Sequence, residues 1–325
     1  MVLRASPDPR RSIAYFSMEI AVDPRIPVYS GGLGILAGDT LRSMADMGLP
    51  VVGVTLAHRK GYFTQKLDED GRQTEDPKSW HLTEFLQPTD GSCRVEVEGR
   101  SVQVRAWVFP VVGIAGHVIP VLFLDTDVEG NTPDDRAITD YLYGGDNRYR
   151  LKQEIVLGIG GIRMLRALGY NQIRKHHMNE GHAALLSLEL LDDELKATRR
   201  GRKGAVERVR EECAFTTHTP VPAGHDRFTQ DLAREVLGAK LFKRARALGA
   251  CNPELNMTSL ALVLSGYVNG VSTKHGEVSR SMFPGYTLHS VTNGVHSATW
   301  TAPALRVLFD KHIPEWRREG GSFRL

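Results

Sequence analysis

Two short segments of the sequence carry side chains that could act on a small polar ligand. Asn179, Glu180 and His182 stand together in "HHMNEGHAALL", where a predicted strand passes into a helix. Glu180 is a candidate general acid or base, and the histidines are candidate metal ligands. Because Asn-Glu-Gly-His lacks the H-E-x-x-H spacing that puts two ligands on one helix face, we expect no metal site.

His218 closes a second predicted strand in "CAFTTHTPVPAGHDRF", and two prolines stiffen the loop that follows. It is a candidate donor to a substrate hydroxyl, although a lone histidine in such a place is more often structural. Asn293, His296 and Trp300 form a further polar cluster in "SVTNGVHSATW", next to an Asn-Gly turn that fixes side-chain positions.

A glycine-rich loop lies near the N-terminus, in "VYSGGLGILAGD" at residues 28–39. Gly31, Gly32 and Gly34 precede or open a predicted helix, whose first turn presents free backbone N–H groups that favour an anion. The spacing matches neither the dinucleotide fingerprint nor the P-loop. Two interpretations therefore stay open: a cradle for a phosphate, or a tight turn that serves packing only.

Apolar runs alternate with helical patterns along the chain, which predicts an α/β fold with a largely parallel sheet. Strands are expected at 12–18, 51–56, 118–128 and 213–219, with a helix at 34–47 and an antiparallel insertion at 62–112. A glycine-interrupted helical region is expected at 139–170, and a helix followed by an apolar turn at 255–272.

The composition is that of an ordinary globular protein with one large domain or two smaller ones. The 325 residues carry a net charge of +3 from interspersed charges, so neither nucleic acid nor a membrane is an expected partner. One basic cluster, at 196–210, is expected to be a solvated loop that leads into a helix. The three cysteines are far apart and no secretory signal is evident, so we expect a cytoplasmic protein.

A series of segments, in order along the chain, resembles the α-glucan phosphorylases, the family that acts on glycogen, starch and maltodextrin, and most closely its short bacterial branch. The segments are "IAYFSMEIA", "YSGGLGILAGDTLRSMADMGLPVVGVTL", "KGYFTQ", "RLKQEIVLGIGGIRML", "HMNEGHAAL", "FTTHTPVPAGHDRF", "LNMTSLALVLSGYVNGVSTKHGEVSR" and "VTNGVH". Because they cover most of the chain in the family's order, the resemblance is specific.

The resemblance implies a glycosyltransferase B architecture, in which two Rossmann-like domains enclose a cleft. In this family, phosphate attacks the terminal α-1,4-linked glucose and releases glucose 1-phosphate. Residues 1–300 would then form the N-terminal domain, with 62–112 as its antiparallel insertion. Residues 301–325 would begin the linker helix toward a second domain.

The resemblance also assigns roles to single residues. The segment formed by Gly31, Gly32, Leu33 and Gly34 resembles the family's loop that closes over the phosphate and the glucose. His218 is similar to the catalytic histidine that hydrogen-bonds the hydroxymethyl group of the glucose, and Asn293 to an asparagine that holds the sugar. Trp300 looks like a tryptophan near the cofactor, while Glu180 and His182 are expected in or beside the cleft.

The family's cofactor is pyridoxal phosphate, held by a lysine in a segment such as "SNMKFALNG". No such segment occurs in these 325 residues, and Lys274 has no comparable context. The expected site is therefore half a site, and we expect the chain by itself to be inactive. Its expected partners are an α-1,4-glucan, inorganic phosphate, and either a separate chain with the second domain or a second copy in a homodimer.

Two other functions stay open. A nucleotide-sugar glycosyltransferase of the glycogen or starch synthase kind shares the architecture and also carries a Gly-Gly-Leu-Gly loop. A non-catalytic glucan-binding remnant of a phosphorylase would bind glucan without turnover.

Overall fold

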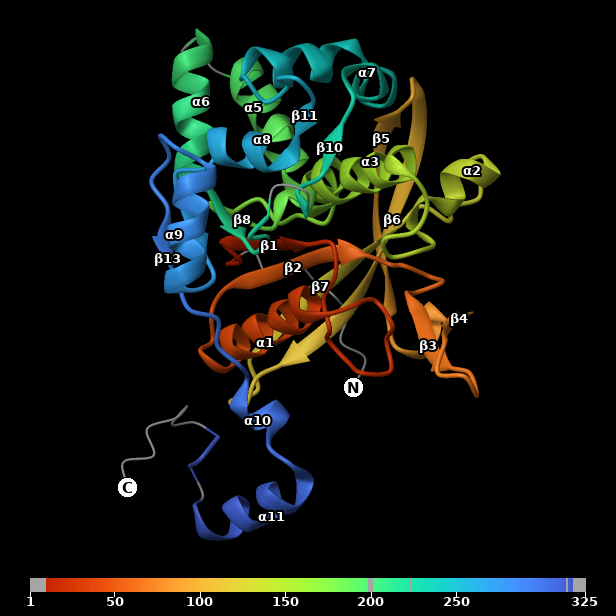
Figure 1. The fold of residues 1–325 in the computed structure, drawn as a ribbon, viewed down its shortest axis with the longest axis vertical. Coiled ribbons are helices and arrows are strands. Elements are labelled where there is room, and N and C mark those ends of the chain that lie inside the picture. The colour runs from red at the N-terminus through yellow and green to blue at the C-terminus, as the bar shows by residue number, and fades with distance from the viewer. Residues whose placement is uncertain (1–9, 198–200, 222–223, 314, 318–325) are drawn as a thin grey trace.

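The computed structural model describes residues 10–197, 201–221, 224–313 and 315–317, and a nine-stranded sheet runs through them (Figure 1). Its order is β13-β12-β9-β8-β1-β2-β7-β6-β5. These strands are β1 (Ile13–Ser17), β2 (Val51–Leu56), β5 (Gln87–Val97), β6 (Arg100–Val112), β7 (Val118–Asp125), β8 (Lys175–Asn179), β9 (Cys213–Thr217), β12 (Tyr267–Gly270) and β13 (His289–Ser290). All neighbours from β13 to β7 are parallel. The prediction of an α/β fold with a largely parallel sheet is confirmed.

The antiparallel strands expected at 62–112 are present, but they belong to two different sheets. β3 (Phe63–Leu67) and β4 (Gln73–Pro77) form a small sheet of their own. β5 and β6 instead extend the edge of the large sheet, since β6 pairs antiparallel with β7 and β5 antiparallel with β6. A third, two-stranded sheet pairs β10 (Arg227–Phe228) with β11 (Leu255–Asn256).

Helices cover both faces of the large sheet, as Figure 1 shows. α1 (Gly32–Asp46) packs on one face, where Tyr15 of β1 lies in the same apolar cluster as Leu41 of α1. Ala14 and Phe16 point to the other face and join a larger cluster with the remaining core helices. This alternation follows from the period of two in a β-strand, so a strand buried on both faces reads as a continuous apolar run.

The other helices follow in chain order. They are α2 (Pro133–Arg136), α3 (Asn147–Ile155), α4 (Gly161–Ala167), α5 (Leu185–Ala197), α6 (Gly201–Glu212), α7 (Gln230–Ala247), α8 (Met257–Val263), α9 (Thr273–Met282), α10 (Ser297–Trp300) and α11 (Pro303–His312). In the described residues, no helix is long and apolar enough to cross a membrane.

Of the glycine-interrupted region expected at 139–170, residues 147–167 are helical, with a π-helical turn, Val156–Gly160, between α3 and α4; residues 140–146 form turns and bends. The glycines of this helix permit close packing. A Cβ at Gly158 would lie 2.6 Å from the Leu186 backbone nitrogen, and one at Gly161 would lie 2.6 Å from a ring carbon of Phe16.

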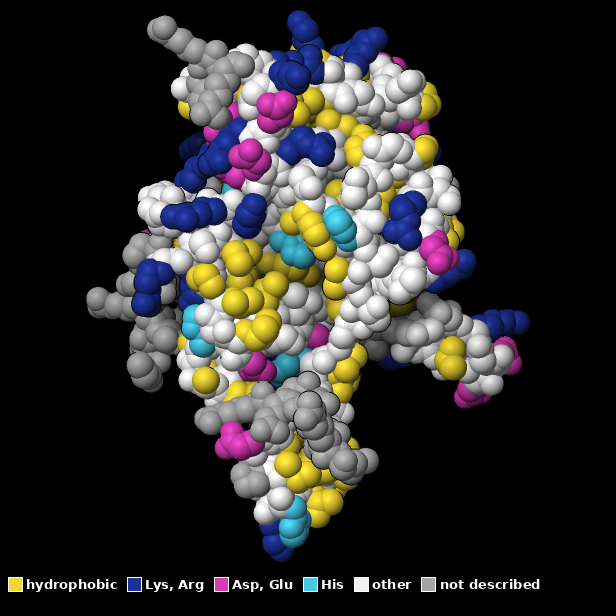
Figure 2. Space-filling model, turned by 90° about the vertical axis from the view of Figure 1, so that its left-hand side faces the viewer, with side chains coloured by type: hydrophobic (Ala, Val, Ile, Leu, Met, Phe, Trp, Pro, Cys, Tyr) yellow, Lys and Arg dark blue, Asp and Glu magenta, His cyan; other side chains and the backbone are white. Residues whose placement is uncertain are grey.

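The structure contradicts one local expectation and confirms part of another. The apolar turn expected after α8 is in fact the strand β12, which pairs with β9; its short run of Tyr-Val-Asn-Gly resembles a turn because the strand is only four residues long. The basic cluster does lead into a helix, α6, although 198–200 lie outside the described residues. Figure 2 shows Lys and Arg mainly on the upper half of one face, with Asp and Glu among them.

The chain beyond residue 296 leaves the body of the fold. α10 and α11 project away from the sheet in Figure 1, and neither contains a buried residue. α11 begins within the expected linker segment, while the basic stub at 318–325 lies outside the described residues.

Candidate functional site

Three of the polar residues singled out from the sequence, Asn179, Glu180 and His218, come together at the end of β8, which lies beside β1. From β1 the chain continues through β2 to β7 on one side, and from β8 through β9 and β12 to β13 on the other. Open parallel sheets bind ligands at such a reversal, outside the carboxyl ends of the strands. A cavity of about 310 Å³ lies here, between α1, the central strands and residues 291–294. We call it the β1–β8 cavity.

Asn179, at the end of β8, connects three segments by hydrogen bonds. Its Nδ2 donates to Ser17 Oγ at 3.0 Å, and that hydroxyl donates to the Glu19 carbonyl at 2.7 Å. Asn179 Oδ1 lies 2.6 Å from His218 Nε2. Since an amide oxygen only accepts, this contact assigns the His218 proton to Nε2 and leaves Nδ1 as an acceptor. Burial lowers the pKa of His218 to about 4, so its ring is neutral at physiological pH.

Glu180 fastens the turn after β9 to the turn after β8. Its carboxylate accepts the backbone N–H groups of His218 at 2.7 Å, Thr219 at 3.1 Å and Gly181 at 3.2 Å, as well as the Thr219 hydroxyl. Burial raises its pKa, while these hydrogen bonds act in the opposite direction. Its φ of 72° is strained for a residue with a side chain. The contacts give Glu180 a structural task at the edge of the site.

Glu19 holds the glycine loop in place through hydrogen bonds. Oε2 of this buried carboxylate accepts the N–H of Ser30 at 2.7 Å and that of Gly31 at 3.4 Å, and Oε1 accepts the Tyr143 hydroxyl at 2.7 Å. α1 starts at Gly32 without a side-chain cap and without an acidic residue in its first turn. The helix start therefore keeps its unpaired N–H groups for another acceptor.

The glycines of this loop divide into two kinds. A Cβ at Gly34 would lie 2.5 Å from Tyr29 Cβ, and a Cβ at Gly38 would lie 2.2 Å from the Ala21 carbonyl oxygen. A Cβ at Gly31 or Gly32 would meet no atom within 4 Å. Packing thus accounts for Gly34 and Gly38, whereas Gly31 and Gly32 leave open space at an uncapped helix start.

Asn293 lines the β1–β8 cavity, as Asn179 does, and its backbone N–H donates to the Val271 carbonyl at 3.0 Å. Trp300 lies elsewhere. Its indole N–H donates to Oδ2 of the buried Asp39 in α1 at 2.7 Å, and Trp300 is about half exposed at 54%. Asp39 also accepts the backbone N–H of His296 at 3.1 Å. These contacts fasten the 296–300 segment to α1.

His182 also lies away from the cavity lining. Its Nε2 is 3.2 Å from a guanidinium nitrogen of Arg150, and its ring contacts that of Tyr143 at a centroid distance of 5.8 Å. Burial, followed by the charge of Arg150, lowers the pKa of His182 to about 4. His182 therefore supports Tyr143, which in turn holds Glu19 beneath the glycine loop.

Several residues of this arrangement were not singled out by the sequence. Glu19 and Tyr143 carry the loop, and a polar row crosses the sheet from His177 through Thr216 to Asn269 at distances of 2.8 and 2.9 Å. The acidic residue in "SMEIA", directly after a predicted strand, was the only available signal for Glu19. Nothing local marks Tyr143, because its partner is 124 residues away.

The β1–β8 cavity does not fit pyridoxal phosphate by its own residues. Among the described residues, its lining contains neither a lysine to bind the aldehyde nor an arginine to pair with the phosphate. Lys274 lies on α9 with its side chain 84% exposed and its ammonium paired with Glu277. Over the described ranges, no group of three or more His, Cys, Asp or Glu side chains is placed to hold a metal ion.

Comparison of the sequence with known proteins supports a site at the glycine loop. A family model described as carbohydrate phosphorylase matches residues 20–110, which include the glycine loop and α1. The chain is 41% identical to the glycogen phosphorylase of Mycobacterium tuberculosis, over 90% of this chain and 37% of the relative. Over 90% of its length, this chain is therefore similar to an α-glucan phosphorylase.

Two further relatives show the same similarity along almost the whole of this chain. The maltodextrin phosphorylase of Thermococcus litoralis is 37% identical over 94% of this chain, and the glycogen phosphorylase of Aquifex aeolicus is 33% identical over the same share. The chain spans 38% and 46% of these two relatives. It therefore corresponds to less than half the length of each of these phosphorylases.

Proposed function

We propose that this chain forms the glycine-loop wall of an α-glucan phosphorylase site, whose substrates are an α-1,4-linked glucan and inorganic phosphate. The observation that carries the proposal is the open space at Gly31 and Gly32. It lies at an uncapped helix start, where N–H groups and the helix dipole favour an anion. The names of the relatives, glycogen and maltodextrin phosphorylase, support the same substrate class.

Within this proposal, the polar residues beside the loop hold the sugar. His218 accepts a hydrogen bond from a glucose hydroxyl through Nδ1, since its Nε2–H donates to Asn179 Oδ1. Asn293 donates or accepts from the other side of the β1–β8 cavity. Leu33 and Gly34 shape the loop, and Glu180 positions the His218 backbone.

The finer architecture belongs to the same proposal. Residues 1–300 would be one Rossmann-like domain of a glycosyltransferase B enzyme, with 301–325 leading toward a second domain. Pyridoxal phosphate would then be bound by residues that do not line the β1–β8 cavity. A cytoplasmic location is part of the proposal on the strength of the family.

The test is a titration of the 325-residue polypeptide with maltoheptaose in the presence of inorganic phosphate, measured by calorimetry. We expect saturable binding that weakens in Gly31→Ala, because the added methyl group fills the space a ligand would use. Ser43→Ala, at the far end of α1, is the matched control and should bind like the parent chain. The polypeptide alone should release no glucose 1-phosphate.

The alternatives give different results in the same experiment. Binding of ADP-glucose in place of phosphate and maltoheptaose would favour a synthase-type glycosyltransferase. Glucan binding that Gly31→Ala leaves unchanged would remove the role of the loop. Release of glucose 1-phosphate by the polypeptide alone would contradict the half-site.

A further inference from the structure

Arg150 of α3 is a largely buried cation whose neighbours come from three other segments. Its side chain is 19% exposed. The guanidinium Nε donates to Asp226 Oδ2 at 3.3 Å, and Nη2 donates to His182 Nε2 at 3.2 Å. Its Cζ lies over the ring of Tyr143, 4.3 Å from the ring centroid. These three contacts hold the guanidinium in one position against the tyrosine ring.

The charge of Arg150 is balanced by one member of a buried pair of acids. Glu154, one turn further along α3, is 0% exposed. Burial, followed by the charge of Asp226, raises the pKa of Glu154 well above its usual range, so this carboxyl is neutral at physiological pH. Asp226 is then the carboxylate that pairs with Arg150. The guanidinium keeps its charge and faces the tyrosine ring as a cation.

Tyr143 connects Arg150 to the glycine loop. Its hydroxyl donates to Glu19 Oε1 at 2.7 Å. Glu19 Oε2 accepts the backbone N–H groups of Ser30 at 2.7 Å and Gly31 at 3.4 Å. The backbone φ of Tyr143 is 56°, in the left-handed region that residues with a side chain rarely adopt. Such a conformation persists only where its surroundings fix it, and the Arg150 guanidinium is part of those surroundings.

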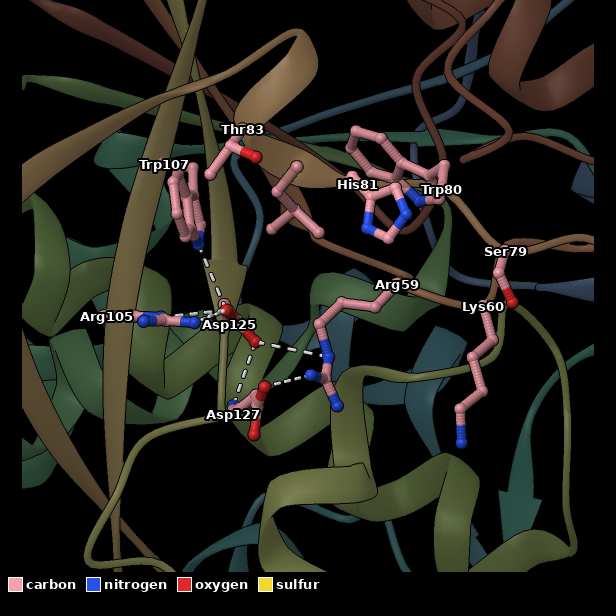
Figure 3. A pocket seen from close by; sticks show the side chains of 11 residues that line it. Arg59, Lys60, Ser79, Trp80, His81, Thr83, Arg105, Trp107, Asp125 and Asp127 are labelled. Carbon is pink, nitrogen blue, oxygen red and sulfur yellow. Dashed lines mark hydrogen bonds and ion pairs between the residues drawn. The ribbon is translucent and has the colours of Figure 1, made fainter.

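A second arginine lies over an aromatic ring in a hollow beside β6 and the end of β7 (Figure 3), but its contacts do not lead elsewhere. The Arg105 Cζ is 5.0 Å from the centroid of the Trp107 ring. Arg105 Nε and the indole N–H both donate to Oδ2 of the buried Asp125, at 2.9 and 3.1 Å. These three side chains bond to one another. The hydroxyl of Tyr143, in contrast, bonds to a separate carboxylate that holds the loop.

We propose that Arg150 is a positioning residue for the glycine loop and acts on the loop through Tyr143 and Glu19. A cation over an aromatic ring is attracted to the face of the ring, so the guanidinium keeps the Tyr143 hydroxyl directed at Glu19. The other carboxylate oxygen of Glu19 is then left to the loop amides. This role rests on the proposed function, because the loop that is positioned is the proposed anion site.

The experiment follows the amide resonances of Ser30 and Gly31 in the ¹⁵N-labelled, ligand-free polypeptide of 325 residues. Arg150→Met removes the charge and keeps an unbranched side chain, and it should shift both resonances. Tyr143→Phe should shift them as well. If Arg150 acts through the tyrosine hydroxyl, the double variant should show the shifts of Tyr143→Phe alone and not the sum of the two. Additive shifts, or no shift with Arg150→Met, would overturn the proposal.

A matched control tests whether any arginine over a ring has this effect. Arg234 of α7 lies over the ring of Phe242 with its Cζ 5.0 Å from the centroid, and its side chain is 53% exposed. Arg234→Met should leave both loop resonances at their parent positions. Shifts as large as those of Arg150→Met would show a general response to lost charge and would overturn the proposal.

A second background keeps the test valid if Arg150→Met does not fold. Arg150→Met leaves Asp226 without its cation, and an unpaired buried carboxylate is strongly destabilising. Arg150→Met combined with Asp226→Asn removes both charges together. The same comparison with and without Tyr143→Phe is then made against Asp226→Asn alone, and additive shifts there would overturn the proposal.

A titration with inorganic phosphate in the presence of maltoheptaose separates this role from the proposed function. Arg150→Met should weaken phosphate binding about three- to tenfold, the range expected when one partly desolvated cation–ring contact is lost. If the parent chain binds no phosphate while the shifts are non-additive, the proposed function is wrong and the positioning role stands. If the parent chain and Arg150→Met bind phosphate equally tightly, the positioning role is wrong.

Discussion

Replacing single glycines of α1 by alanine should separate the packing role of the glycine loop from its open space. Gly38→Ala would place a methyl group 2.2 Å from the Ala21 carbonyl oxygen, well inside the roughly 3.5 Å at which such atoms rest. This carbonyl also accepts from Arg42 at 2.9 Å, and the Ala21 N–H donates to the Gly34 carbonyl at 2.9 Å. The clash therefore falls on backbone that two hydrogen bonds hold in place.

The free-energy change follows from opposing contributions. Overpacking costs about 1–3 kcal/mol, and a weakened hydrogen bond adds about 1 kcal/mol. Alanine in a helix interior returns about 0.5–1 kcal/mol relative to glycine. Gly38→Ala should therefore lower the free energy of unfolding by about 2 kcal/mol. Gly32→Ala, which meets no atom within 4 Å, should leave it unchanged or raise it by up to about 1 kcal/mol.

Urea denaturation of the two variants and the parent chain measures this difference directly. We expect Gly38→Ala to unfold at lower urea with the same slope, and Gly32→Ala to unfold at the parent concentration or above. Equal destabilisation by both substitutions would refute the reasoning, because Gly32 would then be a packing glycine like Gly38.

Three further predictions concern the surroundings of the site. Burial lowers the pKa of His58 to about 4, so the unfolded chain takes up this proton first; the stabilisation is complete above about pH 6.5 and is lost as the pH falls toward 4. His58 alone should remove about 1.5 kcal/mol between pH 6.5 and 5, and His182 and His218, whose pKa values burial lowers likewise, should add to the loss. Urea titration at each pH should therefore show a fall of at least this size; constant stability over that range would contradict it. Tyr143→Phe removes the hydroxyl that donates to Glu19 and should cost about 1–3 kcal/mol in the same assay; no change would show that the loop does not depend on it. Asp39→Ala removes the acceptor of the Trp300 indole and of the His296 backbone N–H, so a protease should cleave the segment from residue 296 onward faster than in the parent chain. An unchanged cleavage rate would mean that other contacts hold the segment.

The sequence predicted the parts of the fold that depend on local pattern. Apolar runs bounded by turns marked β1 and β2, and the helical spacing after Gly34 marked α1. It also placed Asn179 and His218 at the ends of two predicted strands. The structure brings them together because these strands are parallel neighbours whose carboxyl ends share one edge of the sheet.

The parts that were missed depend on contacts between distant segments. The Glu19–Tyr143 hydrogen bond joins residues 124 positions apart, and Asp39 bonds to Trp300 across 261 positions. Neither pair has a spacing that marks it in the sequence. The strand β12 was missed for a different reason, since four residues are too few to show a period of two. Similarly, the alternating pattern of β5 and β6 predicts strands but does not say which sheet they join.

The central claim is that the start of α1 and the β1–β8 cavity together face a glucan and a phosphate. The most direct measurement is an amide NMR titration of the ¹⁵N-labelled polypeptide with maltoheptaose and inorganic phosphate. We predict shift changes centred on the amides of Gly31, Gly32 and Leu33 and on the side-chain amides of Asn179 and Asn293. Saturating changes confined to other surfaces, or none at all, would contradict the claim.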